Sequence, residues 1–212
     1  MNSIFKFDGP VFQFVSRVFD MICLNLLCLL CCIPVITIGP SITALYYSSL
    51  RITRNRESSI GKMFFHSFKN NFKQGILLTL IFIALTVFIV ADIYFCTIFD
   101  VEMLKVARIV LYVLSFVLFM IVSYAFPLLA QFDTTIKDLL KNALILGIGN
   151  LGYTLIIVVL NAIPWVLLFL FPMQFIKTFM LWLFFGFSAI AWVNSKMFVK
   201  IFSKYSSELQ ES

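Results

Sequence analysis

The sequence predicts an all-α fold, a polytopic membrane bundle of about five spanning helices. Of its 212 residues, 62% are hydrophobic and only 12% are charged, and the mean hydropathy is +1.03. A soluble fold of this size cannot cover so much apolar surface, so a bilayer must act as its solvent. Lys and Arg in alternate loops explain the net charge of +6, so a nucleic-acid partner is not expected. We expect one integral membrane domain over residues 1–212.

Five apolar segments are long enough to form membrane-spanning helices. About 20 residues, or roughly 30 Å of helix, suffice to cross the hydrocarbon core. Pro164 lies inside the fourth segment and predicts a kink there. The expected spans are approximately residues 14–33, 74–95, 107–130, 143–171 and 179–198.

The first two spans are separated by a break, residues 33–41, which contains Pro34, Gly39 and Pro40. Proline lacks an N–H donor, so the backbone must leave helical geometry there. Pro40 suits the first position of a new helix, but residues 40–52 are too short to span, so we expect a half-helix or an interfacial continuation. Either the first span crosses with the N-terminus outside, or the chain turns back at the break; the sequence leaves both paths open.

A basic segment follows the break. Residues 51–73 hold six Lys or Arg against Glu57, so the positive-inside rule places them in the cytoplasm. Within this segment, about residues 58–73 place Phe64 and Phe68 on one face and Lys69 on another, which is typical of an amphipathic helix. Such a helix lies on the membrane surface or docks a cytoplasmic partner.

Two groups of residues are candidate functional sites. Asn25, with Thr37, Gly39 and Ser41, lies where the N–H groups of a half-helix could receive an anion or a carbonyl-bearing solute. Alternatively, the hydroxyl groups satisfy the broken backbone, and Asn25 bonds to a neighbouring helix. The second group comprises the cationic side chains that a partner would contact, which are Arg54, Arg56 and Lys69.

No pattern in the sequence predicts catalysis, a cofactor or a metal site. The single histidine, His66, has no nucleophile or carboxylate arranged with it, so we expect no enzyme. Residues 147–152 match the dinucleotide pattern G-x-G-x-x-G but lie in an apolar run. We interpret these glycines as close-packing residues and Asn150 as an interhelical link. Cys28 and Cys31 share a helix face and are interpreted as packing residues.

Several short motifs in residues 1 to about 80 are more specific than composition. They are Asn25-Leu26-Leu27, Ile33-Pro34-Val35-Ile36-Thr37-Ile38-Gly39-Pro40, Ala44-Leu45-Tyr46-Tyr47, Phe64-Phe65 and Phe68-Lys69-Asn70-Asn71-Phe72-Lys73-Gln74. This part of the chain resembles the YesL-like family of bacterial integral membrane proteins. The resemblance implies about five spans in a bacterial cytoplasmic membrane of Firmicutes type, and genes often placed beside carbohydrate ABC-transporter or two-component genes. The family has no established activity, so the resemblance implies no catalytic residues.

These observations favour an accessory or regulatory component of a carbohydrate uptake or sensing system. It would contact ABC-transporter subunits or a membrane sensor through the basic segment, and the lipid bilayer through its spans. The alternative is a small-solute transporter with its site near the break, residues 34–40. The sequence indicates neither a substrate nor an oligomeric state.

Overall fold

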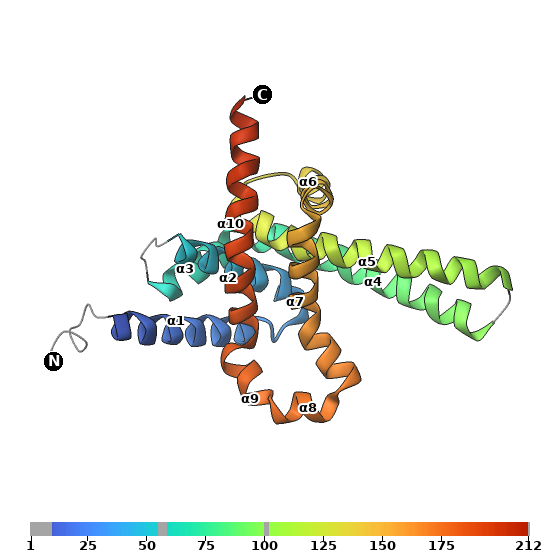
Figure 1. Cartoon of the computed structure of the whole chain (residues 1–212), viewed down its shortest axis with the longest axis horizontal. Coiled ribbons are helices and arrows are strands. Elements are labelled where there is room, and N and C mark those ends of the chain that lie inside the picture. The colour runs from blue at the N-terminus through green and yellow to red at the C-terminus, as the bar shows by residue number, and fades with distance from the viewer. Residues whose placement is uncertain (1–9, 55–58, 100–101, 212) are drawn as a thin grey trace.

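The computed structural model of the chain describes residues 10–54, 59–99 and 102–211, which form helices joined by short links (Figure 1). No strand occurs in these ranges. The elements are α1 (Pro10–Cys31), a 3-10 turn η1 (Val35–Thr37), α2 (Ile38–Thr53), α3 (Ile60–Asn70), α4 (Phe72–Ile98), α5 (Glu102–Gln131), α6 (Ile136–Gly149), α7 (Leu151–Leu170), α8 (Pro172–Lys177), α9 (Phe179–Leu181), a π-helical turn η2 (Trp182–Gly186) and α10 (Phe187–Glu211).

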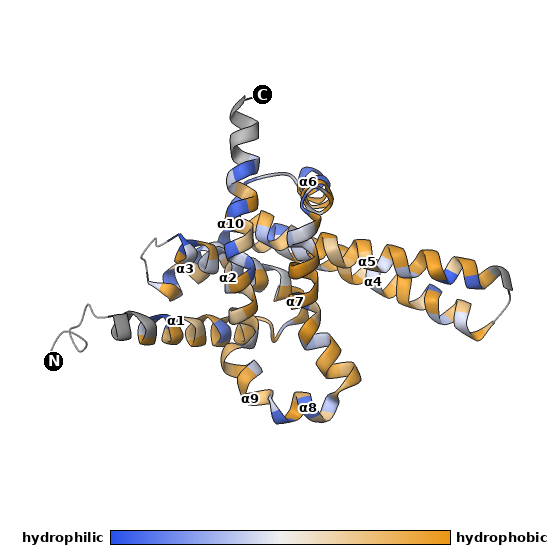
Figure 2. Ribbon diagram, viewed as in Figure 1, coloured by the Kyte–Doolittle hydropathy of each residue, from blue (hydrophilic) through white to orange (hydrophobic). Residues whose placement is uncertain are grey.

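Four helices within the described residues are long and apolar enough to cross a membrane. They are α4, the part of α5 from Leu104, α7, and the continuous stretch Phe179–Tyr205 that runs from α9 through η2 into α10. Figure 2 shows hydrophobic residues along both α4 and α5, as expected for helices that face lipid. Helix α1 corresponds to the remaining expected span. The predicted all-α membrane bundle is therefore confirmed.

Helix α2 lies at the centre of the bundle. None of its residues is exposed, and it packs against α1, α3, α4, α5 and α10. An interfacial helix would keep one face in water or among lipid headgroups, so the interfacial alternative for residues 40–52 is wrong. With 16 residues, α2 is about 24 Å long, which is shorter than a span. Other helices of the chain, rather than lipid or water, therefore cover α2.

The chain turns back at the break. Helix α1 runs toward the break and α2 returns beside it, so α3, which follows α2, contacts α1 (Figure 1). Of the two paths that the sequence leaves open, the structure takes this one. The start of α1 therefore lies on the same side of the bundle as α3.

Two glycines allow α2 and α4 to touch. A Cβ atom on Gly39 would collide with the backbone carbonyl of Gly75 and with Oγ1 of Thr79. A Cβ on Gly75 would lie only 2.7 Å from the backbone nitrogen of Pro40. Because backbone atoms are involved on both sides, no side-chain rotation can relieve the clash. Small residues at a helix crossing are typical of membrane proteins, where close approach provides the packing energy.

The expected fourth span, residues 143–171, is divided in two. Helix α6 ends at Gly149 and α7 begins at Leu151, because Asn150 has φ −127° and ψ 49°, outside the helical region. Figure 1 shows α6 end on, whereas α7 runs down the view, so the chain turns a corner at this residue. Pro164 lies inside α7.

The glycine-rich segment around this corner differs in part from the prediction. Nδ2 of Asn150 donates a hydrogen bond to the carbonyl of Leu146, 3.1 Å away, so Asn150 closes the end of α6. The expectation that it links two helices is wrong. Gly147 does approach another helix closely, because a Cβ there would lie 3.0 Å from Sδ of Met120 on α5. The two other glycines of the segment border open space.

The contact between α2 and α4 predicts a large effect of adding one methyl group. Gly39→Ala should lower the stability by about 1–3 kcal/mol, because the backbone of two helices must separate. This corresponds to a fall of roughly 2–10 °C in the unfolding midpoint measured in detergent. Gly61→Ala on α3 is the matched control, since a Cβ at Gly61 meets nothing within 4 Å. An equal loss in both variants would contradict the role given to the α2–α4 contact.

Candidate functional site

Asn25 joins α1 to the π-helical turn η2. Its side chain is fully buried, and its Nδ2 donates to the carbonyls of Trp182 (3.0 Å) and Leu183 (2.7 Å). Its Oδ1 accepts a hydrogen bond from the N–H of Ser188 (2.9 Å). A π-turn displaces backbone groups from the ordinary helical pattern, and one amide side chain satisfies three of them here. The predicted bond from Asn25 to a neighbouring helix is confirmed.

The hydroxyl groups of the break bind the chain's own backbone. Oγ1 of Thr37 donates to the carbonyls of Cys31 and Pro34, each 2.7 Å away. Oγ of Ser41 donates to the carbonyl of Thr37, also at 2.7 Å. Of the two alternatives for these residues, the structure shows the one in which hydroxyls satisfy the broken backbone. The N-terminal end of α2, including Gly39, is covered by α4 rather than open to a solute.

The structure separates two of the three cationic candidates, Arg54 and Lys69. Arg54 lies just after α2, beside the end of α5, whereas Lys69 is exposed on α3. Arg56 lies outside the described residues. The cationic group that the sequence suggests is therefore not one surface, because Arg54 and Lys69 belong to two different environments.

Helix α3 is amphipathic, as predicted, but it ends earlier than residue 73. Asn71, with φ −97° and ψ 10°, separates it from α4. Met63 and Phe64 are buried, on the side of α3 that packs against α2 and α1. We call the exposed residues of its opposite side the α3 outer face: Lys62, Phe65, His66 and Lys69. Because the apolar side is covered by protein, it cannot insert into the membrane, which favours the docking alternative.

A polar cleft lies between the ends of α2 and α5. It has a volume of about 180 Å³ and is lined by Tyr47, Leu50, Arg51, Arg54, Ala130 and Gln131. We call it the Arg51–Arg54 cleft. Nη1 of Arg54 donates to Oε1 of Gln131, 3.0 Å away. The guanidinium carbon of Arg51 lies 4.9 Å from the ring centroid of Tyr47, within range of a cation–π interaction.

Sequence reasoning missed most of this cleft. It found Arg54 from the charge of the segment, but Gln131 is 77 residues away, and only the fold brings the two together. Tyr47 also connects the cleft to α3, because its ring centroid lies 6.2 Å from that of His66. The spacing of Tyr47 and Arg51, four residues apart in a helix, is the one signal that could have found this pair.

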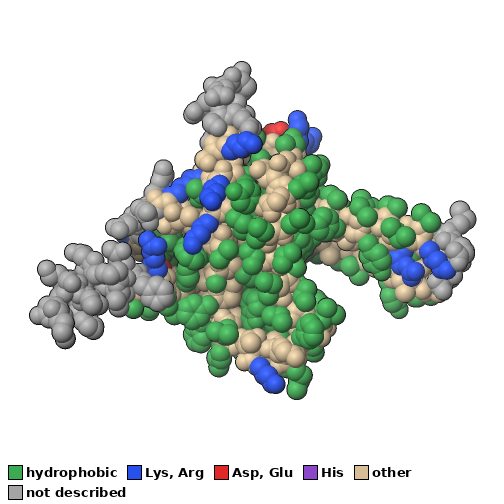
Figure 3. All heavy atoms as spheres, in the orientation of Figure 1, with side chains coloured by type: hydrophobic (Ala, Val, Ile, Leu, Met, Phe, Trp, Pro, Cys, Tyr) green, Lys and Arg blue, Asp and Glu red, His purple; other side chains and the backbone are tan. Residues whose placement is uncertain are grey.

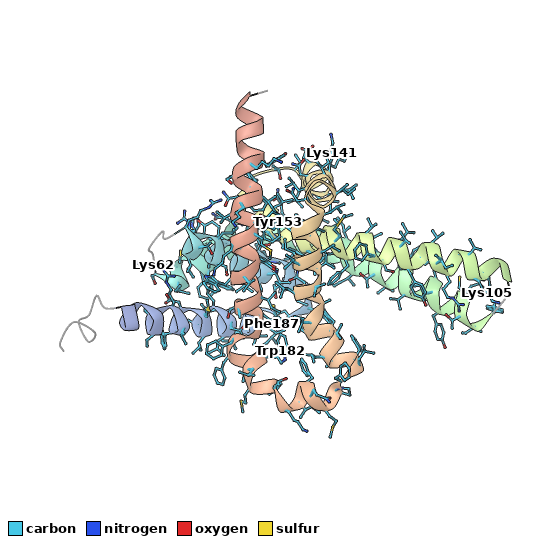
Figure 4. All side chains as sticks on the ribbon, in the orientation of Figure 1. Lys62, Lys105, Lys141, Tyr153, Trp182 and Phe187 are labelled. Atoms are coloured by element: carbon cyan, nitrogen blue, oxygen red, sulfur yellow. The ribbon has the colours of Figure 1, made fainter. Side chains whose placement is uncertain are left out.

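The basic segment and the link after α5 lie on one side of the bundle. Besides the bond from Arg54 to Gln131, Nε2 of Gln74 donates to the carbonyl of Thr134, 3.3 Å away. Figure 3 shows Lys and Arg side chains near α3, on α10 and around α6, and others at the free end of α4 and α5 and beside α8. In Figure 4, Lys62 and Lys141 mark two separate parts of this surface, on α3 and on α6. The sequence predicts that this side faces the cytoplasm.

The cysteines form no site of three or more potential ligands in the part of the chain that the structure describes. Sγ of Cys28 lies 4.0 Å from Sγ of Cys32, one helical turn away, and both thiols are free.

One comparison with known proteins gave a match. Residues 21–93, about a third of the chain, match a family described as "Protein of unknown function, DUF624". The matched residues run from α1 through the break, α2 and α3 into α4. Neither the curated proteins nor the solved structures that were compared with the chain gave a match.

The bonds of Asn25 predict that its removal loosens η2. Asn25→Leu should lower the stability by about 1–3 kcal/mol, because two carbonyls and one N–H lose their partner. Hydrogen exchange of residues 182–188 should become faster at the same time. Asn70→Leu is the control, since Asn70 is exposed and its side chain is hydrogen-bonded to His66 on the same helix; it should change the stability by less than about 0.5 kcal/mol. Unchanged hydrogen exchange of residues 182–188 in Asn25→Leu would contradict the role of Asn25 in holding η2.

Proposed function

We propose that this chain is an accessory membrane protein that binds a partner subunit through the α3 outer face. One observation carries the proposal: the apolar side of α3 is buried against α2 and α1, so the helix is fixed with its cations directed outward. The helix contains no acidic residue. Exposed aromatic rings are enriched at protein-binding surfaces, and the lysines beside Phe65 supply a charge that can complement an acidic partner.

The chemistry of this surface indicates the kind of partner. Lys62 and Lys69 would pair with carboxylates, and Phe65, 42% exposed, would enter an apolar recess. The partner is therefore a membrane subunit with an acidic cytoplasmic face. Its assignment to a carbohydrate uptake or sensing system, as an ABC-transporter subunit or a sensor, rests on the resemblance to the YesL-like family.

Solute transport through the break has less support. The hydroxyls of Thr37 and Ser41 are bonded to the backbone, and α4 covers Gly39. Asn25 uses both its amide nitrogen and its oxygen to hold η2. A transport site there would have to break these contacts before it could bind a solute.

Charge reversal on α3 tests the proposal. The double variant Lys62→Glu, Lys69→Glu should weaken crosslinking to the partner in membranes of the native host by about tenfold or more, equivalent to about 1.4 kcal/mol. Crosslinked products would be identified and quantified by mass spectrometry. Crosslinking should weaken because the two new glutamates repel the acidic side chains of the partner that the lysines attract, while the buried side of α3 is unchanged.

The matched control is Lys137→Glu, Lys141→Glu, which reverses two exposed lysines on α6. This control should retain the partner that the wild-type chain captures. Reversing acidic residues on that partner should restore crosslinking to the α3 variant. The proposal fails if both double variants lose the same product, or if neither does.

A further inference from the structure

We propose that Cys28 and Cys32 form a dithiol site for one soft monovalent metal ion, Cu(I). Both thiols are free, and their Sγ atoms lie 4.0 Å apart at the point where α1 ends and the break begins. The site shares no residue with the α3 outer face. The proposal therefore goes beyond partner docking and does not depend on it.

The distance between the two sulfur atoms is the first argument. Metal–thiolate bonds are about 2.3 Å long, so two sulfurs on one ion lie about 4.0 Å apart at an angle of about 120° and about 4.6 Å apart in a linear arrangement. The separation of 4.0 Å between Cys28 and Cys32 falls within this range. The N–H of Cys32 donates to the carbonyl of Cys28, 2.9 Å away, which holds the two residues one turn apart. One ion can therefore join both sulfurs without a change in the backbone.

The donor set is the second argument, because it selects the ion. Within the described ranges, no group of three or more His, Cys, Asp or Glu side chains could hold a metal. Structural zinc sites take four ligands, and iron–sulfur clusters take four cysteines. Thiolates are soft ligands that select Cu(I), and Cu(I) is satisfied by as few as two of them. A pair of thiols therefore favours Cu(I) over the divalent ions.

The charge of the complex is the third argument. Cu(I) displaces the protons of both thiols, so the complex carries a single negative charge. Helix α2 begins at Ile38, and the hydroxyl of Ser41 in its first turn lies within hydrogen-bond reach of Sγ of Cys32. The N-terminal end of a helix carries a partial positive charge of about +0.5. The start of α2 is therefore placed to offset part of the negative charge of the complex.

The break gives the ion a route to the site. Cys28 is only 4% exposed, but Cys32 is only partly buried, and two residues that follow it, Ile33 and Val35, are exposed. The start of α1 lies on the same side of the bundle as α3, so the last turn of α1 and the break lie away from that side (Figure 1). An ion that arrives at the break therefore meets Cys32 before Cys28.

Titration of the purified full chain with Cu(I) tests the proposal, with ascorbate to keep the ion reduced and bicinchoninate as the competing chelator. The wild type should hold a single Cu(I), and Cys28→Ser, Cys32→Ser should bind it about a hundredfold more weakly or worse. The matched control, Cys23→Ser, Cys96→Ser, also removes two thiols and should bind within about threefold of the wild type. Cys32→Ser alone changes a partly buried position, and it should lose the same affinity even if the double variant folds poorly.

The pH dependence of binding counts the thiols that take part. Because two protons leave, the affinity should rise about a hundredfold per pH unit while the thiols are protonated, against about tenfold if only one thiol binds. Equal affinities of the wild type and Cys28→Ser, Cys32→Ser would overturn the proposal, as would failure of the wild type to hold Cu(I) against the chelator. So would a tenfold slope, an equal loss in the control, or displacement of Cu(I) by an equal concentration of Zn²⁺.

Discussion

The contact between Gly39 on α2 and Gly75 on α4 holds the centre of this protein together. The break ends α1 and returns the chain along it, and the two glycines then let α2 approach α4 to backbone distance. Thr37 supports the turn because its hydroxyl lies within hydrogen-bond distance of the carbonyls of Cys31 and Pro34, where the helical pattern of α1 ends. A short helix that cannot span the membrane thereby becomes the core around which the other helices pack.

Polar side chains fix α2 against the spans. Oη of Tyr46 accepts a hydrogen bond from Nδ2 of Asn194 on α10 (3.1 Å), and the same nitrogen donates to Oδ1 of Asn161 on α7 (2.9 Å). Such bonds specify the orientation of helices that apolar contacts alone would leave free to rotate. Asn25 does the same between α1 and η2. The end of α2 is then a fixed platform for both α3 and the Arg51–Arg54 cleft.

The elements that the sequence predicted well are those governed by local pattern. Long apolar runs predicted the spans, and Pro34 with Pro40 predicted the break, because both depend on hydrogen bonds within a few residues. Residues 143–171 were less predictable: their apolar character continues through Asn150, which nevertheless leaves helical geometry. The central place of α2 depends on contacts with five other helices, which no local pattern contains.

The candidate residues show the same division. The bond from Asn25 to another helix could be predicted, because an amide in hydrocarbon needs a hydrogen-bond partner. The partner itself, η2, lies more than 150 residues away in the chain, and no local pattern identifies it. The density of positive charge in the segment pointed to Arg54 and Lys69. It did not show that Arg54 lies beside the end of α5 whereas Lys69 is exposed on α3. Nothing in the sequence around Gln131 predicted a role for it, because a glutamine at the end of a span is common. Its role depends on the guanidinium of Arg54, which only the fold brings beside it.

The central claim is that α2 holds α3 with its apolar side buried and its cations exposed on the cytoplasmic side. Maleimide labelling of single cysteines, in a variant whose five native cysteines are replaced, measures this directly. Lys62→Cys should be labelled in inverted membrane vesicles and not in right-side-out vesicles, and Phe64→Cys should be protected in both until the protein is denatured. Labelling of Phe64→Cys as fast as that of Lys62→Cys, or labelling of Lys62→Cys from the outside alone, would contradict the account.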